Sequence, residues 1–340
     1  MASDAEPTVN RRVTLAARPD GHPVPSDYSI ETEEVDALPP GQVRIGVDVL
    51  SIDAFIRTTF DEGSFHGTVP LGGTIGALGV GTVVESADES LAVGDVVAGG
   101  LGAQTVATLP AGAVQRIDTS EFPASTHLGA LGLTTGLTAY VGVVHVGAVG
   151  PGDTVVVSGA AGAVGTYAGQ FARLAGAERV IGIAGGPEKG AFLVDELGYD
   201  ASIDYRGDDV GARLDELAPD GVDVFFDNVG GEILDEVLVR IRERARVVIC
   251  GAISQYGNMD AVAGPSNYLK LAERHARMEG FTVLHFADRF DEARAAIGRW
   301  ISDGSLVQHD HVEHGIEAFP HALDVLLTGG HRGKLMVAVS

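Results

Sequence analysis

The sequence is poor in cysteine, in positive charge and in long apolar runs. Its one cysteine, Cys250, excludes an internal disulfide and a structural zinc site built from cysteines. Basic residues number 23 against 47 acidic ones, and the net charge of −24 argues against a nucleic-acid or anionic-membrane partner. The chain lacks a run of about 18 apolar residues that could span a membrane, and its first residues contain no apolar signal core. We therefore expect a soluble, cytoplasmic protein.

Glycine, by contrast, is abundant, with 47 residues in a chain of 340, and 45% of all residues are apolar. This length and apolar content are enough for two domains. Up to about residue 117, short strand patterns alternate with Gly and Pro turn signals, which predicts an all-β, barrel-like first domain. The predicted strands cover residues 12–15, 28–33, 42–51, 80–85, 95–98 and 104–109.

The stretch 153–184 carries the strongest pattern in the chain. A β-branched run at 154–157 predicts a buried strand, and Gly159, Gly162 and Gly165 follow at intervals of three. A helical pattern comes next, and a second strand is predicted at 179–184. Strand, glycine turn, helix and strand form one βαβ unit, in which glycines let the backbone approach a pyrophosphate and the helix start attracts its charge. The pattern indicates a dinucleotide site.

Strands and helices then alternate. Helices are predicted at 126–144, 187–197, 210–217 and 232–241, and strands at 201–204, 222–226, 247–250 and 281–285. This alternation is typical of a doubly wound parallel sheet, whose ligands bind at the carboxyl ends of the strands. The tail 308–340 reads as strand, helix and strand. We expect it to return to the first domain, which then comprises 1–127 plus 306–340, with the dinucleotide-binding domain at 128–305.

The end of the second predicted strand distinguishes the two nicotinamide cofactors. An NAD site usually has a carboxylate there for the ribose 2′-hydroxyl, whereas this chain has Gly185 and Gly186. Lys189 follows within one turn, and Tyr205 and Arg206 end the third strand. A cation and a phenol could hold a 2′-phosphate by charge-assisted hydrogen bonds, which favours NADP(H). The alternative is that Lys189 is only an exposed residue at the start of a helix.

Several motifs together resemble a known family. AAGAVG, IAGGPEK, IDY, FDNVGG and CGAISQY occur in this order, and NRRVTLAARPDG, MEGFTV and ADRF also match. As a set they are similar to the zinc-independent medium-chain dehydrogenases/reductases, in the branch of prostaglandin, alkenal and curcumin reductases, over nearly the whole chain. The resemblance implies a GroES-like, barrel-type catalytic domain and a Rossmann domain. It also implies reduction of the C=C bond of α,β-unsaturated ketones and aldehydes with NADPH.

The resemblance further implies the site residues. The cofactor contacts would be Gly162, Ala163, Val164, Gly165, Gly185, Lys189, Tyr205, Asn228, Cys250, Gly251, Ala252, Ile253, Ser254, Tyr256, Phe281, Val283 and His331. Tyr256 is the residue that the family places near the substrate carbonyl. Hydride addition to the β-carbon leaves an enolate, and a phenol donor would stabilise the charge on its oxygen. The alternative is a loop tyrosine that only covers the cofactor.

This chain departs from the family pattern on the substrate side. Phe55 stands where a tyrosine is usual before Arg57, so a substrate-facing hydroxyl is missing. Leu101 and Ala103 stand where relatives often have an aromatic residue, and His331 replaces a common asparagine. Phe55 and Arg57 are our candidate substrate residues, although Arg57 fits a salt bridge at a domain interface equally well.

Other classes of function fit the sequence less well. Zinc alcohol dehydrogenases have the same two-domain layout but need Cys and His ligands, so we expect no metal. His309, His311 and His314 could be read as metal ligands, but the acidic residues among them favour a solvated strand. A quinone oxidoreductase of the same superfamily and a non-catalytic cofactor-binding protein remain alternatives. The family implies a homodimer, for which pairing of edge strands at 281–285 is one arrangement.

Overall fold

The computed structural model describes residues 9–257 and 262–339, which divide into two compact units. The first unit comprises the chain up to Leu128, together with His311–Gly330 and the residues from Leu335 on. The second comprises Gly129–Asp310 and the short segment His331–Lys334. The predicted domain boundaries at 127/128 and 305/306 stay a prediction. They assign His331–Lys334 to the first domain, whereas this segment belongs to the second compact unit.

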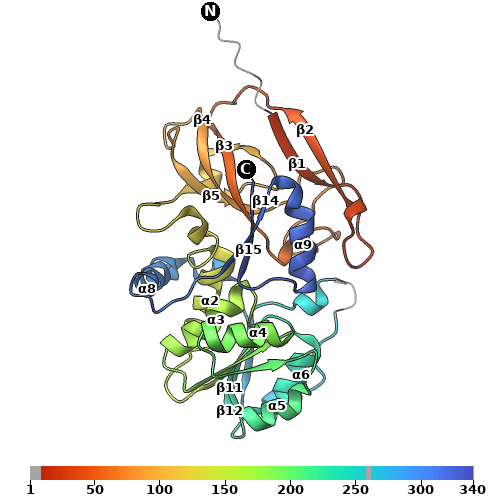
Figure 1. The fold of residues 1–340 in the computed structure, drawn as a ribbon, viewed down its shortest axis with the longest axis vertical. Coiled ribbons are helices and arrows are strands. Elements are labelled where there is room, and N and C mark those ends of the chain that lie inside the picture. Colours follow the sequence, from red (N-terminus) through yellow and green to blue (C-terminus); the bar gives the residue numbers. More distant parts are fainter. Residues whose placement is uncertain (1–8, 258–261, 340) are drawn as a thin grey trace, which may run out of the picture. The chain divides into compact units, whose positions relative to one another are not determined.

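Short strands build the first unit, as the sequence predicts. They are β1 (Val9–Leu15), β2 (Tyr28–Glu34), β3 (Gln42–Ser51), β4 (Leu78–Ser86), β5 (Val96–Gly100), β6 (Val106–Pro110), β7 (Val114–Arg116), β14 (Asp310–His314) and β15 (Lys334–Ala338). Two helices, α1 (Phe55–Thr58) and α9 (Phe319–Thr328), accompany them (Figure 1). β1 pairs with β2, and the larger sheet runs β14-β15-β3-β4-β5-β7 with β6 added to β3. The tail pattern of strand, helix and strand is confirmed.

The second unit contains one six-stranded sheet in the order β10-β9-β8-β11-β12-β13. The strands are β8 (Thr154–Ser158), β9 (Arg179–Ala184), β10 (Ala201–Asp204), β11 (Val222–Asp227), β12 (Ile241–Ile249) and β13 (Arg277–Gly280), and every pairing between neighbours is parallel. From β8 the chain builds outward to β10 and then returns to β11 beside β8. This reversal is the switch point of a doubly wound sheet, which confirms the predicted fold class.

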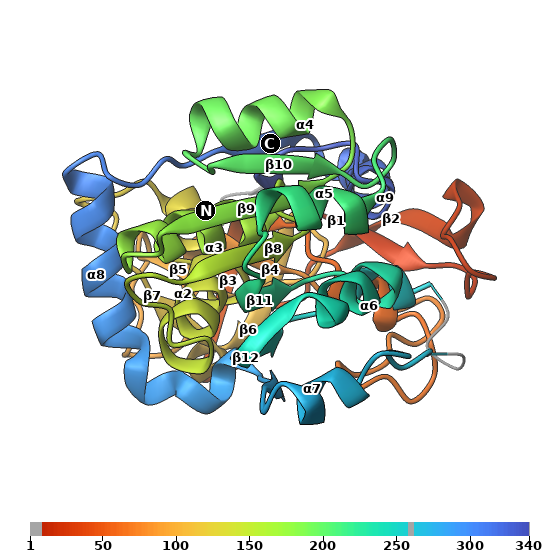
Figure 2. The ribbon, with the colours of Figure 1, turned by 90° about the horizontal axis from the view of Figure 1, so that it is seen from below.

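Helices connect these strands. They are α2 (Thr138–Tyr140), α3 (Ala163–Leu174), α4 (Pro187–Ala191), α5 (Val210–Leu217), α6 (Gly231–Val239), α7 (Leu269–Glu273) and α8 (Phe290–Ser302). Asp209 begins α5, because its carboxylate accepts the Ala212 N–H at 2.9 Å. α4 lies beside β10 (Figure 2).

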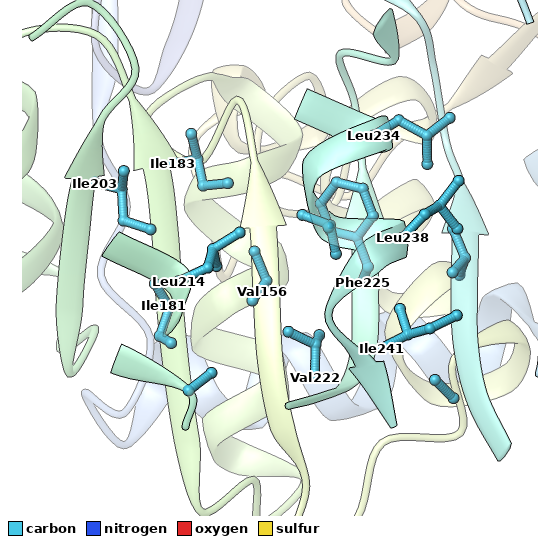
Figure 3. Packing of buried hydrophobic residues seen from close by; sticks show 14 residues of the cluster. Val156, Ile181, Ile183, Ile203, Leu214, Val222, Phe225, Leu234, Leu238 and Ile241 are labelled. Atoms are coloured by element: carbon cyan, nitrogen blue, oxygen red, sulfur yellow. The ribbon is translucent and has the colours of Figure 1, made fainter. Parts of the chain in front are cut away.

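One face of the parallel sheet packs against α5 and α6. Val156, Ile181 and Phe225 of the strands contact Leu214 of α5 and Leu238 of α6, all of them buried (Figure 3). Burying a side chain of this size contributes about 1.5–3 kcal/mol, so this layer is a main source of the unit's stability. The β-branched runs read as strands in the sequence are therefore the residues that hold the sheet to its helices.

The predicted strand at 281–285 is wrong. β13 lies at Arg277–Gly280, and Val283–Arg289 forms a 3-10 helix. Parallel pairing with β12 ends at Ile249 opposite Gly280, so the β-branched residues beyond it have no neighbouring strand to pair with in this sheet. All four residues of β13 are exposed, and their mixed polarity hides the strand from a pattern search.

The predicted helix at 126–144 is only partly right. A 3-10 turn covers Ala124–His127, Gly132 is extended with φ −75° and ψ 142°, and the helical stretch begins at Leu133 and runs in wide turns to Val146. A Cβ at Gly136 would lie 1.7 Å from the Ala130 carbonyl oxygen, so this glycine lets the chain fold back tightly before the helix. The apolar pattern of the sequence correctly predicts that this stretch is buried, but it does not predict the extended break in the helix at Gly132.

Within the two described ranges, none of the helices combines the length and the apolar character that crossing a membrane requires. The cytoplasmic location stays a prediction.

Candidate functional site

The glycine turn joins β8 to α3 at the carboxyl edge of the sheet. Gly159 has φ +57°, a conformation that favours glycine. A Cβ at Gly165 would lie 2.3 Å from the Gly159 carbonyl oxygen, so only glycine lets the helix start this close to the strand. The Tyr199 hydroxyl donates to the Gly165 carbonyl at 2.7 Å and fixes the same turn. Ala163 and Val164 are the first helical residues, whose N–H groups point out of the helix start.

A buried carboxylate ties this turn to the neighbouring strand. Asp227, at the end of β11, is fully buried and accepts hydrogen bonds from the Ser158 hydroxyl at 2.7 Å and the Val229 and Gly230 N–H groups at 3.0 Å. Burial raises the pKa of Asp227 above its ordinary value, and these hydrogen bonds lower it. Asn228 is held by the same residue, Ser158, through its N–H at 2.8 Å and its side-chain amide at 2.7 Å. These hydrogen bonds therefore join the end of β8 to the end of β11 at the switch point.

Ser158 and Asp227 were not predicted as site residues. Their only sequence signal is a polar residue ending each of two apolar strands, and the pairing of Val157 with Phe226 is needed to bring them together. We expect Asp227→Asn to lower the free energy of unfolding by about 1–3 kcal/mol, because the NH2 group that replaces Oδ2 is a donor and faces the Gly230 N–H, which Oδ2 accepts at 3.1 Å. Urea titration measures this. Asp291→Asn, at an exposed aspartate of α8, should leave the midpoint unchanged, and an equal midpoint for both variants would contradict the assignment.

The end of β9 brings three predicted residues together. A Cβ at Gly185 would lie 2.8 Å from Arg206 Nε and 2.9 Å from Tyr205 Cε1, so the glycine makes room for the side chains that follow β10. Arg206 Nε donates to the Tyr205 hydroxyl at 3.3 Å. Lys189, in α4, is half-buried, which disfavours the interpretation as an exposed helix-start residue. Burial and the charges of Arg206 and Arg332 lower the pKa of Lys189.

Asp204 is a carboxylate close to this end of the sheet, but it caps backbone groups. It accepts from the Gly186 N–H at 2.7 Å and the Arg206 N–H at 3.0 Å. These two hydrogen bonds lower the pKa of Asp204, so it stays ionised and bound to its own turn.

The loop after β12 is hydrogen-bonded onto the loop after β11. The Cys250 and Gly251 N–H groups donate to the Asp227 carbonyl at 2.9 and 3.2 Å, and the Ile253 N–H donates to the Asn228 carbonyl at 3.1 Å. The Ser254 hydroxyl donates to the Val229 carbonyl at 2.6 Å. Residues 250–256 thus lie at the carboxyl edge of the same sheet as the glycine turn. Burial and the Asp227 carboxylate raise the pKa of the Cys250 thiol to about 12, which supports an inert thiol.

Tyr256 folds back over this loop. Its hydroxyl oxygen accepts the Ala252 N–H at 3.3 Å and lies 3.1 Å from the position of a Cβ on Gly251. Burial raises the pKa of Tyr256, the Ala252 hydrogen bond lowers it, and Cys250 adds a smaller increase. The phenol is therefore neutral at physiological pH and can donate its own hydrogen.

The remaining predicted cofactor residues divide between two segments. Phe281 and Val283 follow β13 at the carboxyl end of that strand and are half-buried. His331 is buried in the returning segment, where the Gly333 N–H donates to the Ala161 carbonyl of the glycine turn at 2.9 Å. The structure thus brings the segment that contains His331 to the glycine turn, and a cofactor contact of His331 stays a prediction.

The two candidate substrate residues lie in the first unit. Arg57 is 2% exposed, and its guanidinium donates to the Gly21 carbonyl at 2.8 Å and to the Asp61 carboxylate at 3.0 Å. These contacts join residues of the first unit, and both interpretations of Arg57, as a substrate residue and as a salt bridge at a domain interface, stay predictions. Phe55 is half-buried, with its ring 5.3 Å from that of His66.

Within 9–257 and 262–339, no three His, Cys, Asp or Glu side chains form a group that could hold a metal ion. The histidines of the tail have other contacts: His309 packs on the Phe192 ring at 4.8 Å, and His311 lies 3.0 Å from Glu313. The absence of a catalytic metal stays a prediction.

Comparison with known proteins agrees with this geometry. Residues 11–117 match a family model described as an N-terminal domain of oxidoreductase, and residues 163–299 match one described as a zinc-binding dehydrogenase. The chain is 41% identical over 335 residues to YfmJ of Bacillus subtilis, named as an NADP-dependent oxidoreductase, covering 97% of this chain and 98% of that one. It is 36% identical over 343 residues to an NADP-dependent 2-alkenal reductase of Nicotiana tabacum, covering 99% of both.

A solved structure is similar over the same length. The structure of CurA from Vibrio vulnificus in complex with NADPH has a TM-score of 0.91 at 32% identity, covering 97% of this chain and 99% of that one. Full-length similarity at these identities shows the family. The chain therefore belongs to the zinc-independent medium-chain dehydrogenases/reductases, in the branch that contains the curcumin, alkenal and prostaglandin reductases.

Proposed function

We propose that this protein is an NADPH-dependent reductase that saturates the C=C bond of α,β-unsaturated ketones and aldehydes. The observation that carries the proposal is the loop 250–256, which is hydrogen-bonded to the strand end beside the glycine turn and holds a neutral phenol, Tyr256, at that edge. A dinucleotide site and a hydrogen-bond donor thus belong to the same edge of one sheet, where ligands of doubly wound proteins bind.

The described residues fit NADP(H). The glycine turn, with Gly162 to Gly165, would hold the pyrophosphate because a Cβ at Gly165 would close the space that the turn needs. Lys189 and Tyr205 would hold the 2′-phosphate beside Gly185, where a carboxylate would repel it. The relatives named for NADP dependence and the NADPH complex of CurA support this choice of cofactor.

The cofactor, when bound, supplies the hydride that the β-carbon of the substrate receives. The chain's own part is to stabilise the negative charge that then develops on the carbonyl oxygen. The Tyr256 hydroxyl would donate to that oxygen while its own oxygen accepts the Ala252 N–H. Because the pKa of Tyr256 is raised, the phenol keeps its proton at physiological pH and can donate it in a hydrogen bond to the developing oxyanion.

Quinone reduction by NADPH is the second candidate, because it uses the same glycine turn and the same Lys189 and needs no metal. A non-catalytic cofactor-binding protein is the third. Tyr256 favours the first, since its phenol would stabilise the enolate oxygen that forms when hydride adds to the β-carbon.

NADPH oxidation measured with a panel of enones, enals and quinones separates these functions. We expect turnover with enones or enals, slower turnover with NADH, and none with the saturated ketone of matched size. Turnover confined to quinones would support the second function. Stoichiometric NADPH binding without turnover of any compound would support the third.

We also propose that the protein is a homodimer, as its family implies. The exposed edge of the parallel sheet is β13 and not 281–285, and exposed edge strands are sites of pairing with a second chain. Light scattering should give twice the chain mass of 35.1 kDa. A single species at the chain mass, over micromolar concentrations, would contradict the dimer.

A further inference from the structure

The segment His331–Lys334 is fastened to the second unit although the residues on both sides of it belong to the first. The Gly333 N–H donates to the Ala161 carbonyl at 2.9 Å, and the Lys334 N–H donates to the His309 carbonyl at 2.9 Å. Gly333 has φ +69°, and a Cβ there would lie 2.0 Å from the His309 carbonyl oxygen. Only glycine fits at this close approach, which fixes the backbone on either side of it.

This backbone presents Arg332 to the helical stretch that contains Lys189. The Arg332 guanidinium carbon lies 5.3 Å from the centre of the buried Phe192 ring, and one of its nitrogens lies 4.0 Å from Glu196 Oε1. Lys189, Phe192 and Glu196 follow each other at intervals of three and four residues, so they share one face of this helical stretch. Arg332 thus lies against Phe192 and Glu196, in the helical stretch that begins with α4 and contains Lys189.

Three positive groups therefore gather at the end of β9. Arg206 lies against Gly185, with its Nε 2.8 Å from the position of a Cβ there. The charges of Arg206 and Arg332 both reach Lys189 and, with burial, lower its pKa. The chain has 23 basic and 47 acidic residues, and acidic side chains also lie near these three cations: Asp204 accepts the Arg206 N–H, and Glu196 lies 4.0 Å from Arg332. Each of the three groups would attract a bound dianion, and this attraction would outweigh their mutual repulsion.

We propose that Arg332 is a third cation of the 2′-phosphate site and increases the preference of the protein for NADPH over NADH. This inference rests on the assignment of Lys189 and Tyr205 to that phosphate. A phosphate monoester carries about 1.5 to 2 negative charges at pH 7, more than one lysine neutralises. The planar guanidinium, held over Phe192, offers two parallel donors to phosphate oxygens.

Isothermal titration with adenosine 2′,5′-bisphosphate and adenosine 5′-monophosphate tests the inference without turnover. Arg332→Met keeps an apolar stem on Phe192 and removes the charge, so we expect the dissociation constant for the bisphosphate to rise about tenfold, with the monophosphate unchanged. Arg332→Lys should restore most of the loss. Arg294→Met is the matched control, because Arg294 also lies over a phenylalanine, Phe290, at 5.6 Å and beside an aspartate.

The titrations distinguish a wrong role for Arg332 from a wrong assignment of the 2′-phosphate site. Equal changes for both nucleotides, or no change in Arg332→Met while Lys189→Gln weakens the bisphosphate, would overturn the role of Arg332 and leave the phosphate site intact. Equal affinities of the wild-type protein for both nucleotides would overturn the phosphate site itself and Arg332 with it.

Discussion

Tyr256→Phe should reduce the turnover of an enone about 100- to 1,000-fold, the range measured for removal of one donor to an oxyanion. The phenylalanine ring retains the packing of the loop and loses only the hydroxyl that would donate to the carbonyl oxygen. The Ala252 N–H loses its acceptor in the variant, which is a change of one part-buried hydrogen bond within the loop 250–256. We therefore expect the dissociation constant for NADPH to stay within about twofold of wild type, a shift worth less than 1 kcal/mol.

Tyr268→Phe is the matched control for this prediction, because Tyr268 lies in the same unit and is 56% exposed. Its turnover should equal that of wild type. Unchanged turnover in Tyr256→Phe would remove Tyr256 from the chemistry, and a parallel loss of NADPH affinity would show that the residue only covers the cofactor.

The pH dependence provides a second readout of the same residue. Burial raises the pKa of Tyr256 above the ordinary value of 10.0, so the phenol keeps its proton up to and beyond that pH. Turnover of an enone should therefore not fall through loss of this proton below about pH 10. A decline with an apparent pKa near 8 that Tyr256→Phe abolishes would contradict the neutral-donor role.

Lys189→Gln should raise the dissociation constant for NADPH about 10- to 100-fold and leave that for NADH unchanged. A hydrogen bond to a charged group is worth about 1.5–3 kcal/mol, and only NADPH carries the 2′-phosphate that would receive it. Titration of NADPH and of NADH with the protein, followed by the change in nicotinamide fluorescence, measures both dissociation constants.

Lys270→Gln is the control for the lysine prediction. Lys270 also lies in a short helix of the second unit and pairs with Glu273 at 2.7 Å. It should leave both constants unchanged. If Lys189→Gln weakened both cofactors equally, the lysine would support the loop around it and not the phosphate.

The local structure of the glycine turn and of the end of β9 could be predicted from the sequence because its signals are local, and the cofactor contacts of these residues stay a prediction. Gly159 to Gly165 form the turn and helix start that follow a β-branched strand, and Gly185 follows the next strand only a few residues before Lys189. The glycine turn and the end of the second strand are each formed by one short stretch of chain, where the spacing and type of the residues determine the local geometry.

The parts that could not be predicted depend on contacts between distant segments. The Ser158–Asp227 bond needs the register of β8 against β11, and Arg332 lies over Phe192 only because Gly333 fits against His309. β13 was missed because its residues are exposed, and an edge strand needs no apolar alternation.

The central claim is that the C=C bond, and not the C=O bond, is reduced, and mass spectrometry of the product tests it most directly. An enone is incubated with the protein and NADPH that carries deuterium at the transferred position. We predict a saturated ketone with one deuterium on the β-carbon. An allylic alcohol with deuterium on the former carbonyl carbon, or an enone recovered without deuterium, would contradict it.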